Sequence, residues 1–334
     1  MRVNVLVRQV DGSAYYRMIL PARALKATGY DVEVIMPPKP EDRDNFEIRD
    51  ADIVVINRPD NAGTIHMIEE LKADGVKIIV DIDDLYNDIS KNHSMYKMKD
   101  EIHAYALQSA DLADVMIGST PSIASRYRSS TGVSAVVNNY VPESYLSLTQ
   151  TEMRDGAYLL GWSGTIGSHP NDLQVAGPAV KRALALHRHW RFAHLGPAEE
   201  GKQVCNALGI TRTRSSGWLP FERYAPALAQ LNVGIVPLEN RRFNRRGKSW
   251  LKMAEFAACG VPVIASATDA NQELYNAGVG EIAHNKDEWN RKLHNLIGSP
   301  DAMHEQIVKN REVMDYYTIE NNLHQWIDAW EVAA

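Results

Sequence analysis

The sequence predicts an α/β protein built from two doubly wound parallel-sheet domains, each Rossmann-like, that face one another across a cleft. Short β-rich runs alternate with amphipathic helical patterns in both halves of the chain, which is typical of parallel sheets covered by helices. The alternation stops at residues 138–155, NNYVPESYLSLTQTEMRD, and then restarts. The length of 334 residues also suits two domains of ordinary size.

The first half supplies six β-rich runs separated by helical patterns and by one loop. We expect strands at Val3–Val7, Val32–Ile35, Ile53–Ile56, Lys77–Val80, Val115–Ile117 and Ala135–Val137. We expect helices at Tyr15–Thr28, Thr64–Ala73, Met95–Ser109 and Ser122–Ser129. The stretch 36–44 is rich in proline and charge, and it therefore predicts a loop.

The second half repeats the pattern and ends in a helix that carries two tryptophans. We expect strands at Tyr158–Trp162, Arg191–His194, Thr211–Ser215, Val233–Val236, Val263–Ala265 and Glu281–Ala283. We expect helices at Asp172–His187, Lys202–Leu208, Glu222–Leu231, Ser249–Cys259, Asn271–Ala277, Asp287–Ile297, Ala302–Met314 and Ile319–Trp330. Leu323, Trp326, Ile327 and Trp330 recur at helical spacing, so the last helix should dock on another surface.

The composition indicates an ordinary globular protein. Hydrophobic residues make up 45% and charged residues 23% of the chain, and the formal net charge of -6 gives no general signal for nucleic acid or anionic membranes. The two cysteines, Cys205 and Cys259, follow no metal-binding or redox spacing and suit a reducing compartment. A strand-like run starts at the third residue and no apolar run reaches about 18 residues, so we expect a cytoplasmic protein without signal peptide or transmembrane segment.

The most informative stretch is GKSWLKMAEFAACGVPVIAS, residues 247–266. We interpret it as a loop, a helix and a buried strand, with Lys248, Lys252 and Glu255 on roughly one helical face. Two lysines four residues apart repel one another, and an anion at the helix start would relieve this repulsion. A carboxylate farther along can accept hydrogen bonds from two hydroxyls, so the pattern fits a nucleoside diphosphate. The alternative is a surface ion pair between Lys252 and Glu255.

Two small-residue loops follow predicted strands. In LGWSGTIGSHPNDL, Ser163, Gly164 and Thr165 favour a loop that holds phosphate through backbone N–H groups, and His169 adds a positive charge to it; an ordinary turn is the alternative. In DGSAYYR, Gly12 lets a ligand approach the backbone, whereas the alternative is a helix start capped by Ser13. Neither loop has the glycine spacing of a dinucleotide fingerprint or a P-loop.

Three further features lie near strand ends. A cluster of carboxylates follows the fourth strand, namely Asp81, Asp83 and Asp84. It is a candidate for a metal site, for an acceptor-binding or catalytic carboxylate, or for helix capping. We favour the acceptor-side carboxylate. Trp218 and Leu219 either frame a planar base or form a hydrophobic staple. The basic loop RRFNRRGK, residues 241–248, has three possible interpretations. It attracts a diphosphate electrostatically, it binds a polyanionic acceptor, or it is an ordinary solvated loop.

The features in this order resemble family 4 of the retaining glycosyltransferases, the group 1 glycosyl transferases with the GT-B fold. The resemblance runs through DGSAYYR, ADIVVINRP, SADLADVMIGSTPSIASRY, LGWSGTIGSHPNDL, LPFERYAPALAQLNVGIVPLE and GKSWLKMAEFAACGVPVIAS, so it covers nearly the whole chain. It implies an acceptor-side domain at residues 1–150, a nucleotide-sugar domain at 151–312 and a terminal helix at 313–334 that crosses back to the first domain.

The resemblance also implies roles for single residues. Glu255 matches the second glutamate of the family's E-x7-E signature, which binds the ribose hydroxyls, and Lys248, beside Ser249, matches the residue that neutralises the donor diphosphate. The first glutamate would fall at Gly247 and is absent, which leaves the donor sugar open. His169 stands where the family has a second basic residue. We therefore place Lys248, Asp84 and Asp81 in the catalytic set.

Gly12, Ser163, Gly164, Thr165, His169, Trp218, Leu219, Lys248, Ser249 and Glu255 form the predicted donor-binding set. The implied function is transfer of a sugar from a UDP- or GDP-sugar to an acceptor hydroxyl, as a hexosyltransferase, with retention, without a metal and without a permanently bound cofactor. The acceptor stays open among a glycan, a lipid, a protein and a modified nucleic acid. A non-catalytic GT-B-like binding subunit and a sugar-nucleotide epimerase are the alternatives.

Overall fold

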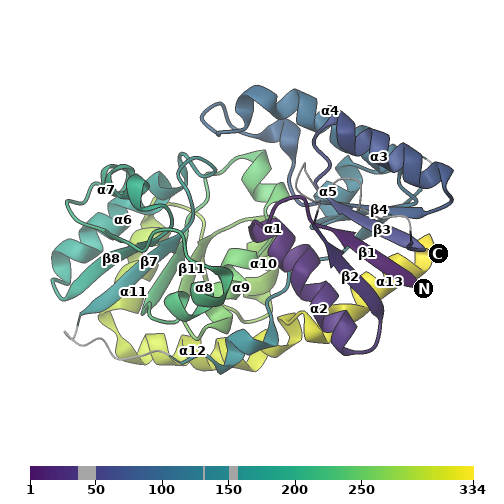
Figure 1. Cartoon of the computed structure of the whole chain (residues 1–334). Coiled ribbons are helices and arrows are strands. Elements are labelled where there is room, and N and C mark those ends of the chain that lie inside the picture. The colour runs from purple at the N-terminus through teal and green to yellow at the C-terminus, as the bar shows by residue number, and fades with distance from the viewer. Residues whose placement is uncertain (37–49, 131, 150–156) are drawn as a thin grey trace.

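The computed structural model describes residues 1–36, 50–130, 132–149 and 157–334 of the chain. Two α/β domains lie side by side, and the chain returns to the first domain at its C-terminus (Figure 1). Most of the predicted loop at 36–44 and the predicted domain boundary at residue 150 lie outside the described residues, so both stay predictions.

The first domain contains a six-stranded parallel sheet with the strand order β2-β1-β3-β4-β5-β6. Its strands are β1 (Arg2–Leu6), β2 (Asp31–Ile35), β3 (Ile53–Asn57), β4 (Lys77–Ile82), β5 (Val115–Gly118) and β6 (Val133–Val136). The central strands β3, β4 and β5 are almost continuously buried and apolar, as a parallel sheet with two covered faces requires.

Helices cover both faces of this sheet (Figure 1). They are α1 (Gly12–Ala14), the π-helix η1 (Tyr15–Ile19), α2 (Leu20–Ala27), α3 (Ala62–Ala73), η3 (Tyr86–Asp88), η4 (Tyr96–Met98), α4 (Lys99–Leu112), α5 (Pro121–Arg126) and η5 (Glu143–Ser147). Side-chain caps begin three of them, because Asp11, Asn61 and Thr120 each accept a hydrogen bond from a backbone N–H of the first turn. The cap of the first helix is therefore Asp11 rather than Ser13.

The second domain repeats the architecture with the strand order β12-β11-β10-β7-β8-β9, again all parallel. Its strands are β7 (Tyr158–Ser163), β8 (Trp190–Leu195), β9 (Arg214–Ser215), β10 (Val233–Val236), β11 (Val263–Ser266) and β12 (Glu281–Ala283). The strand predicted at Thr211–Ser215 is reduced to its last two residues, because this edge strand pairs with β8 only there.

The helices of the second domain pack on both faces of its sheet. They are α6 (Asp172–Leu186), η6 (Ala198–Glu200), α7 (Gly201–Leu208), α8 (Phe221–Leu228), the π-helix η7 (Phe243–Gly247), α9 (Leu251–Ala258), α10 (Asp269–Asn276), α11 (Lys286–Gly298) and α12 (Pro300–Met314). The short turns η8 (Asp315–Tyr317) and η9 (Glu320–Asn322) lead into α13 (Leu323–Ala333).

A pair of glycines brings α9 close to the sheet. Gly161 of β7 and Gly234 of β10 are register partners in neighbouring strands. A Cβ atom on Gly234 would lie 2.5 Å from the Phe256 ring, and a Cβ atom on Gly161 would lie 2.3 Å from a methyl group of Leu231. Both glycines therefore allow side chains to rest directly on the backbone of the sheet. The contact at Gly234 involves Phe256 of α9, the helix that carries Glu255.

The terminal helix α13 crosses back and packs on the first domain, as the sequence predicted (Figure 1). Trp326 is 2% exposed, and its indole N–H donates to the carbonyl oxygen of Arg17 at 3.3 Å. Just before the helix, Thr318 forms a parallel bridge with Val141. The chain thus ties both domains together through its last segment.

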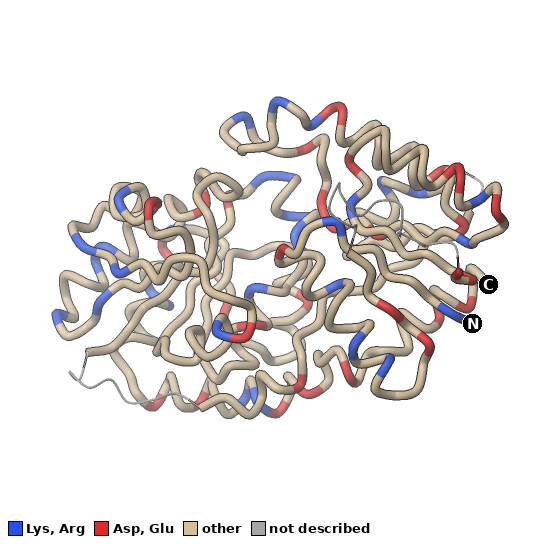
Figure 2. Tube along the Cα trace, in the orientation of Figure 1, with Lys and Arg blue, Asp and Glu red and all other residues tan. Residues whose placement is uncertain are grey.

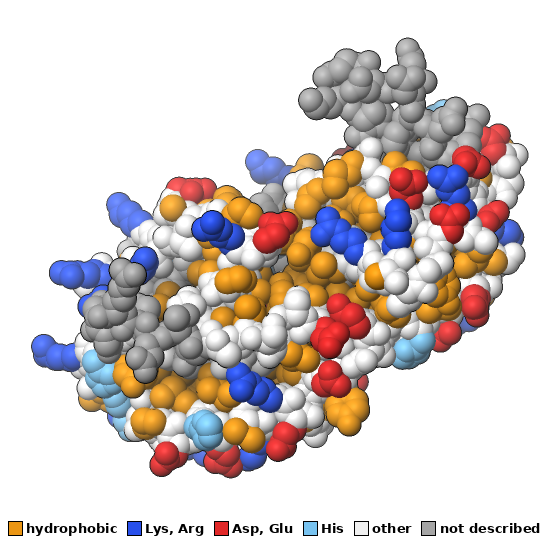
Figure 3. Space-filling model, turned by 60° about the horizontal axis from the view of Figure 1, so that its bottom comes forward, with side chains coloured by type: hydrophobic (Ala, Val, Ile, Leu, Met, Phe, Trp, Pro, Cys, Tyr) orange, Lys and Arg blue, Asp and Glu red, His pale blue; other side chains and the backbone are white. Residues whose placement is uncertain are grey.

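The surface carries charges of both signs. Acidic and basic positions alternate over both domains (Figure 2), and on the face seen in Figure 3 they lie around hydrophobic side chains without one large patch of a single sign. Cys205 and Cys259 are both free thiols. Within the described ranges, no helix has the length and apolar character needed to cross a bilayer.

Candidate functional site

The chain order of the strands locates the candidate sites. In open α/β sheets, ligands bind at the carboxyl ends of strands where the strand order reverses direction. In the second domain this point lies between β7 and β10, and in the first domain it lies between β1 and β3. The segments that follow these four strands are the loop after Ser163, the segment 237–250, the turn at Gly12 and the turn at Arg58.

A hydrogen-bonded network spans the reversal point of the second domain. The Ser163 hydroxyl lies 2.7 Å from the Tyr224 hydroxyl, which donates to Glu255 Oε2 at 2.9 Å. Lys252 donates to the same carboxylate oxygen at 2.9 Å and to the Tyr224 hydroxyl at 2.8 Å. The Lys252 ammonium also lies 4.9 Å from the centre of the Tyr224 ring. The network connects the end of β7, helix α8 and helix α9.

Glu255 lies deeper than the sequence suggested. Its side chain is fully buried, and its Oε1 atom has no hydrogen-bond partner in the described chain. Loss of contact with water alone would lower the pKa of Lys252, but Glu255 and Tyr224 outweigh it and raise that pKa. Lys252 is thus a cation beside the Glu255 side chain. The Tyr224 hydroxyl occupies the carboxylate oxygen that the sequence assigns to a ribose diol.

Lys248 lies in extended backbone between η7 and α9, with φ at -83° and ψ at 134°. Because α9 begins at Leu251, Lys248 does not share a helical face with Lys252 and Glu255, and that prediction was wrong. The Lys248 ammonium instead reaches across the cleft to Asp84, at 2.9 Å, and lies 4.7 Å from the centre of the Phe243 ring. Burial raises the pKa of Asp84, but Lys248 and Arg58 outweigh it, so this pKa is below its ordinary value.

Gly247, the position of the missing first glutamate, is buried against the first domain. A Cβ atom there would lie 3.0 Å from Leu85 Cγ and 3.1 Å from Leu85 Cδ1. Leu85 directly follows Asp84, so the glycine and the Lys248–Asp84 pair belong to the same interdomain contact. The space beside Gly247 is therefore filled by an apolar side chain of the first domain.

The loop after β7 is held from several directions. The His194 ring is stacked on Trp162, with 5.2 Å between ring centres, and its Nε2 lies 2.9 Å from the carbonyl oxygen of Gly164. The Gly164 N–H donates to the Leu195 carbonyl at 3.1 Å. The Ile166 N–H donates to the Glu200 carboxylate at 2.7 Å. Two of the backbone donors predicted for phosphate therefore already have partners within the protein.

His169 and Thr165 stabilise this loop. The Thr165 carbonyl accepts a hydrogen bond from the His169 N–H at 3.0 Å. The His169 ring nitrogen Nδ1 lies 2.7 Å from Asp172, whose other carboxylate oxygen accepts from the Glu239 N–H at 2.7 Å. Asp172 thus occupies one ring nitrogen of His169, the residue that the sequence assigns to a phosphate contact.

The first domain contributes a charged cluster opposite these groups. Gly12 opens α1, and no atom lies within 4 Å of a Cβ placed on it, so the backbone there is open to a ligand. Arg58 adopts a left-handed conformation, with φ at 52°, which is strained for an arginine. It pairs with Asp11 at 3.0 Å and with Asp83 at 3.4 Å. Burial raises the pKa of the Asp83 carboxyl despite the nearby Arg58 guanidinium.

Asp81 does not face the cleft. Its side chain is fully buried, and it receives hydrogen bonds from Arg17 Nε at 2.7 Å, Arg17 Nη2 at 2.6 Å and Asn57 Nδ2 at 3.0 Å. Arg17 also donates to the Val137 carbonyl, so the pair connects the first helix with the sheet. This placement contradicts a catalytic contact for Asp81 and gives it an internal structural role.

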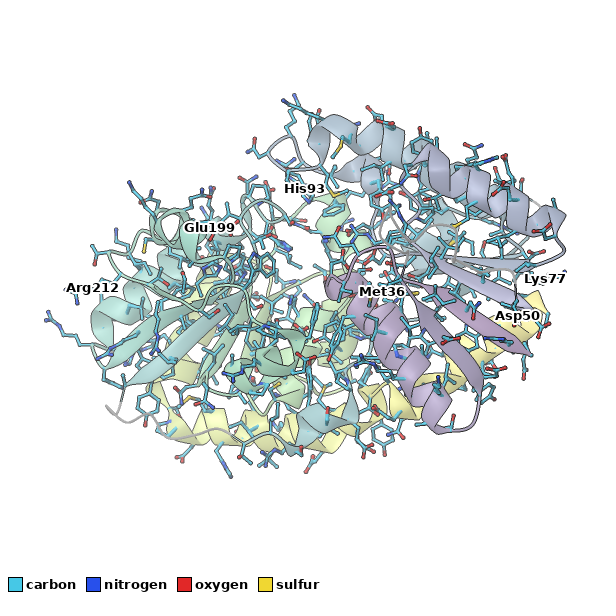
Figure 4. The ribbon with its side chains drawn as sticks, in the orientation of Figure 1. Met36, Asp50, Lys77, His93, Glu199 and Arg212 are labelled. Atoms are coloured by element: carbon cyan, nitrogen blue, oxygen red, sulfur yellow. The ribbon has the colours of Figure 1, made fainter. Side chains whose placement is uncertain are left out.

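The remaining predicted residues lie around the same edge. Trp218 is 74% exposed in the segment between β9 and α8, with Leu219 beside it, and neither contacts the Ser163–Tyr224–Lys252–Glu255 network in a described bond. The Ser249 hydroxyl accepts from Asn139 of the first domain at 2.7 Å. His93 precedes α4, and Figure 4 shows it between the two domains.

Sequence reasoning missed three residues of the site, namely Tyr224, Arg58 and His194. Tyr224 lies in the quoted motif LPFERYAPAL, and Arg58 lies two residues after the predicted strand Ile53–Ile56. His194 is the last residue of a predicted strand. A position at or just after a strand end was a usable signal for Arg58 and His194, whereas the contact of Tyr224 with Glu255 depends on how α8 packs beside α9.

No group of three metal-ligating His, Cys, Asp or Glu side chains occurs among the residues that the structure describes. The three aspartates after β4 separate into different environments. Asp81 pairs with Arg17, Asp83 with Arg58, and Asp84 with Lys248. Each carboxylate thus has a basic partner in place of a shared cation.

Comparison with known proteins agrees with this architecture. Residues 178–328 match a family model described as glycosyl transferase-like. HepE from Anabaena, solved with UDP and glucose, is similar in structure with a TM-score of 0.69 at 12% sequence identity, covering 99% of each chain. Sucrose-phosphate synthase from Thermosynechococcus elongatus has a TM-score of 0.73 at 12% identity, covering 99% of this chain and 98% of that one.

A glycosyltransferase from Rickettsia africae has a TM-score of 0.67 at 14% identity, covering 99% of this chain and 98% of that one. No curated protein matches the chain in sequence. The chain is therefore a protein of the GT-B fold, and the predicted resemblance to the group 1 glycosyl transferases is confirmed. The matched family model lies in the second domain and the segment that follows it.

Proposed function

We propose that this protein is a glycosyltransferase that moves a hexose from a UDP- or GDP-sugar to an acceptor hydroxyl, with retention of configuration and without a metal ion. The observation that carries the proposal is the network of Ser163, Tyr224, Lys252 and Glu255 at the strand-order reversal of the second domain. It places a buried carboxylate and a cation where an open α/β sheet binds its ligand. HepE, of the same fold, is known with UDP and with UDP-glucose.

The charges of the site suit departure of a diphosphate. When the bond between the anomeric carbon and the diphosphate oxygen breaks, negative charge grows on the leaving group and positive charge grows on the sugar. Lys248 and Lys252 stabilise the first of these charges. The acceptor oxygen bonds to the anomeric carbon on the same face, and its proton passes to the leaving phosphate oxygen. In this scheme no side chain is a covalent nucleophile and none takes the acceptor proton.

Lys248 occupies a central place in the scheme because it joins the two domains. Its ammonium is paired with Asp84 without ligand, and a bound diphosphate would compete with that carboxylate. In the proposal, Asp84 therefore sets both the position of Lys248 and part of its charge balance, and Lys248 and Asp84 remain in the catalytic set without Asp81. Gly12 lies on the first-domain side, where it leaves space for the donor phosphate and the acceptor.

The proposal predicts that the protein binds UDP or GDP through Lys248. In Lys248→Ala, we expect the dissociation constant for the preferred nucleotide to rise by roughly 10- to 100-fold, since hydrogen bonds to charged groups contribute about 1.5–3 kcal/mol. Calorimetric titration of the purified protein measures this constant. Lys181→Ala, an exposed lysine in α6, is the matched control and should bind as the unchanged protein does.

The nature of the reaction needs a second measurement. We would incubate the protein with a panel of nucleotide sugars and follow the donor by mass spectrometry. Release of the nucleoside diphosphate by hydrolysis or transfer would support the proposed reaction. Conversion of the donor into an isomeric sugar nucleotide would indicate the epimerase alternative, and absence of nucleotide binding would contradict the proposal.

A further inference from the structure

A basic pocket opens at the domain interface, beside the proposed donor site. It encloses about 450 Å³. The first domain lines it with Asp88, Ser122, Ser125 and Arg126, and the second domain lines it with Arg242 and Arg246 of the basic loop. Figure 2 shows this loop as basic positions lying between the two domains. The sequence indicated that the loop meets an anion, and the structure directs two of its arginines toward this pocket.

The three guanidinium groups of the pocket are incompletely neutralised. Arg242 pairs with Asp88 at 3.3 Å. Arg126 donates to His103 Nε2 at 2.7 Å, and the pKa of His103 is lowered by burial and by Arg126, so this partner is neutral. The Arg246 side chain has no hydrogen bond or ion pair within the part of the chain that is described. Three cations therefore face one carboxylate.

The pocket is directly connected to the proposed reaction site. Leu85, which lines the pocket, packs against Gly247 and is the residue after Asp84. On the opposite wall, Arg246 is separated from Lys248 by Gly247 alone. The Thr120 hydroxyl donates to the Arg246 carbonyl oxygen at 3.2 Å and holds the loop against the first domain. The pocket is therefore lined by the direct chain neighbours of the segments that carry the Lys248–Asp84 pair.

We propose that this pocket binds a phosphate monoester group carried by the acceptor, through Arg126 and Arg246. The inference rests on the proposed function, because it names the acceptor class of the same enzyme. A phosphate monoester carries about −1.5 to −2 charges at pH 7, which matches the two positive charges left after Asp88 is counted. The planar guanidinium fork also matches two phosphate oxygens better than an ammonium group does.

The size of the pocket agrees with this class of ligand. A volume of about 450 Å³ lies in the range of pockets that hold small molecules, and it leaves space for a sugar ring besides the phosphate. Ser122 and Ser125 offer hydroxyl groups to the remaining phosphate oxygens.

The test measures binding while the donor site is filled. The full-length protein is first saturated with UDP or GDP, whichever binds, so that added phosphate cannot enter the donor site. Glucose 6-phosphate and, as the neutral match, glucose are then titrated by calorimetry at constant ionic strength. In a second arm, phosphatidylcholine vesicles with and without phosphatidic acid are tested by co-sedimentation. The two arms distinguish a soluble ester from a lipid headgroup.

We expect phosphate-dependent binding in one arm and a loss of at least about tenfold in affinity in Arg246→Gln and Arg126→Gln, from the loss of a charge-assisted contact. Arg241→Gln, in the same loop but paired with Glu239, is the matched control and should retain the binding. Binding in neither arm, or equal binding in all four proteins, would overturn the inference. Failure of nucleotide binding in the first step would count against the proposed function instead.

Discussion

The Lys248–Asp84 ion pair joins the two domains at the proposed donor site. Both side chains are a little more than one-fifth exposed, so the pair is neither a surface contact nor fully desolvated. Without ligand, the cation that we propose for diphosphate binding is therefore paired with a carboxylate. In this proposal the Asp84 carboxylate competes with the donor diphosphate for Lys248, and it also keeps the Lys248 side chain in position.

Asp84→Asn tests which of these two actions governs binding. We expect the affinity for UDP or GDP to rise roughly two- to fivefold, because Lys248 loses an ionic partner worth about 0.5–1 kcal/mol. Sugar transfer should fall, because the lysine is less well placed. Calorimetry and a turnover assay on the same preparation measure both. A weaker nucleotide affinity would show that Asp84 chiefly positions Lys248.

The lowered pKa of His93 predicts that the stability of the protein depends on pH. Burial and the nearby Lys248 lower its pKa below the ordinary value of 6.5. Below pH 6.5 the unfolded chain binds a proton at this residue before the folded chain does. The contribution of His93 to stability is therefore present above pH 6.5 and is lost as the pH falls through the lowered pKa.

His93→Gln should reduce the loss of melting temperature between pH 7.5 and pH 5.5. Thermal unfolding followed by circular dichroism at both pH values measures the difference. His66, whose side chain is 74% exposed, provides the matched variant His66→Gln, which should unfold as the unchanged protein does at both values. Equal pH dependence in all three proteins would contradict the assignment to His93.

At the scale of elements, α9 depends on the close approach that Gly234 permits. The Phe256 ring rests on Gly234, and Glu255 is the residue before it in the same helix. A side chain at Gly234 would push the helix away from the sheet. Because Glu255 contacts Tyr224 and Lys252 through one oxygen, a small shift of α9 would also disturb the network.

Gly234→Ala should lower the free energy of unfolding by about 1–3 kcal/mol, the usual effect of overpacking a core. Urea denaturation monitored by tryptophan fluorescence measures this loss. Adding Phe256→Leu to the same protein removes the ring atoms that the new methyl group meets. The double variant should therefore lose less than the sum of the two single variants, and strict additivity would speak against the contact.

At the scale of the whole molecule, α13 ties the end of the chain to the domain in which the chain begins. Trp326 and Trp330 are both buried in this interface, at 2% and 1% exposure. Trp326 also donates to the carbonyl oxygen of Arg17, whose side chain holds Asp81. The terminal helix thus supports the segment that follows the Gly12 turn.

Trp326→Ala should lower the free energy of unfolding by about 3–5 kcal/mol, because it removes a large buried ring. Chemical denaturation measures the change, and nucleotide titration shows whether the second domain still binds its ligand. Val332→Ala, on the same helix with its side chain 56% exposed, is the control and should change stability little. A small effect of Trp326→Ala would indicate that the first domain is stable without the terminal helix.

The sequence by itself determined the alternation of strands and helices, the two domains and a last helix that docks on another surface. The family resemblance added that this helix returns to the first domain. Buried parallel strands need continuous apolar runs, and docked helices need regular apolar spacing, so local patterns suffice for these features. The segments around Lys248, Glu255, Ser163 and Gly12 were also found in this way, because ligand sites follow strand ends. The confirmed fold rests on these local signals.

The tertiary structure alone decided which of the predicted charges meet. Asp81 and Asp84 are three residues apart in the sequence. Asp81 is nevertheless buried and paired with Arg17, whereas Asp84 is paired with Lys248 of the other domain. Tyr224 reaches Glu255 only because α8 packs beside α9, and Leu85 fills the space at Gly247 from another domain. Contacts between distant segments depend on packing and on the closure of two domains, which spacing along one chain does not encode.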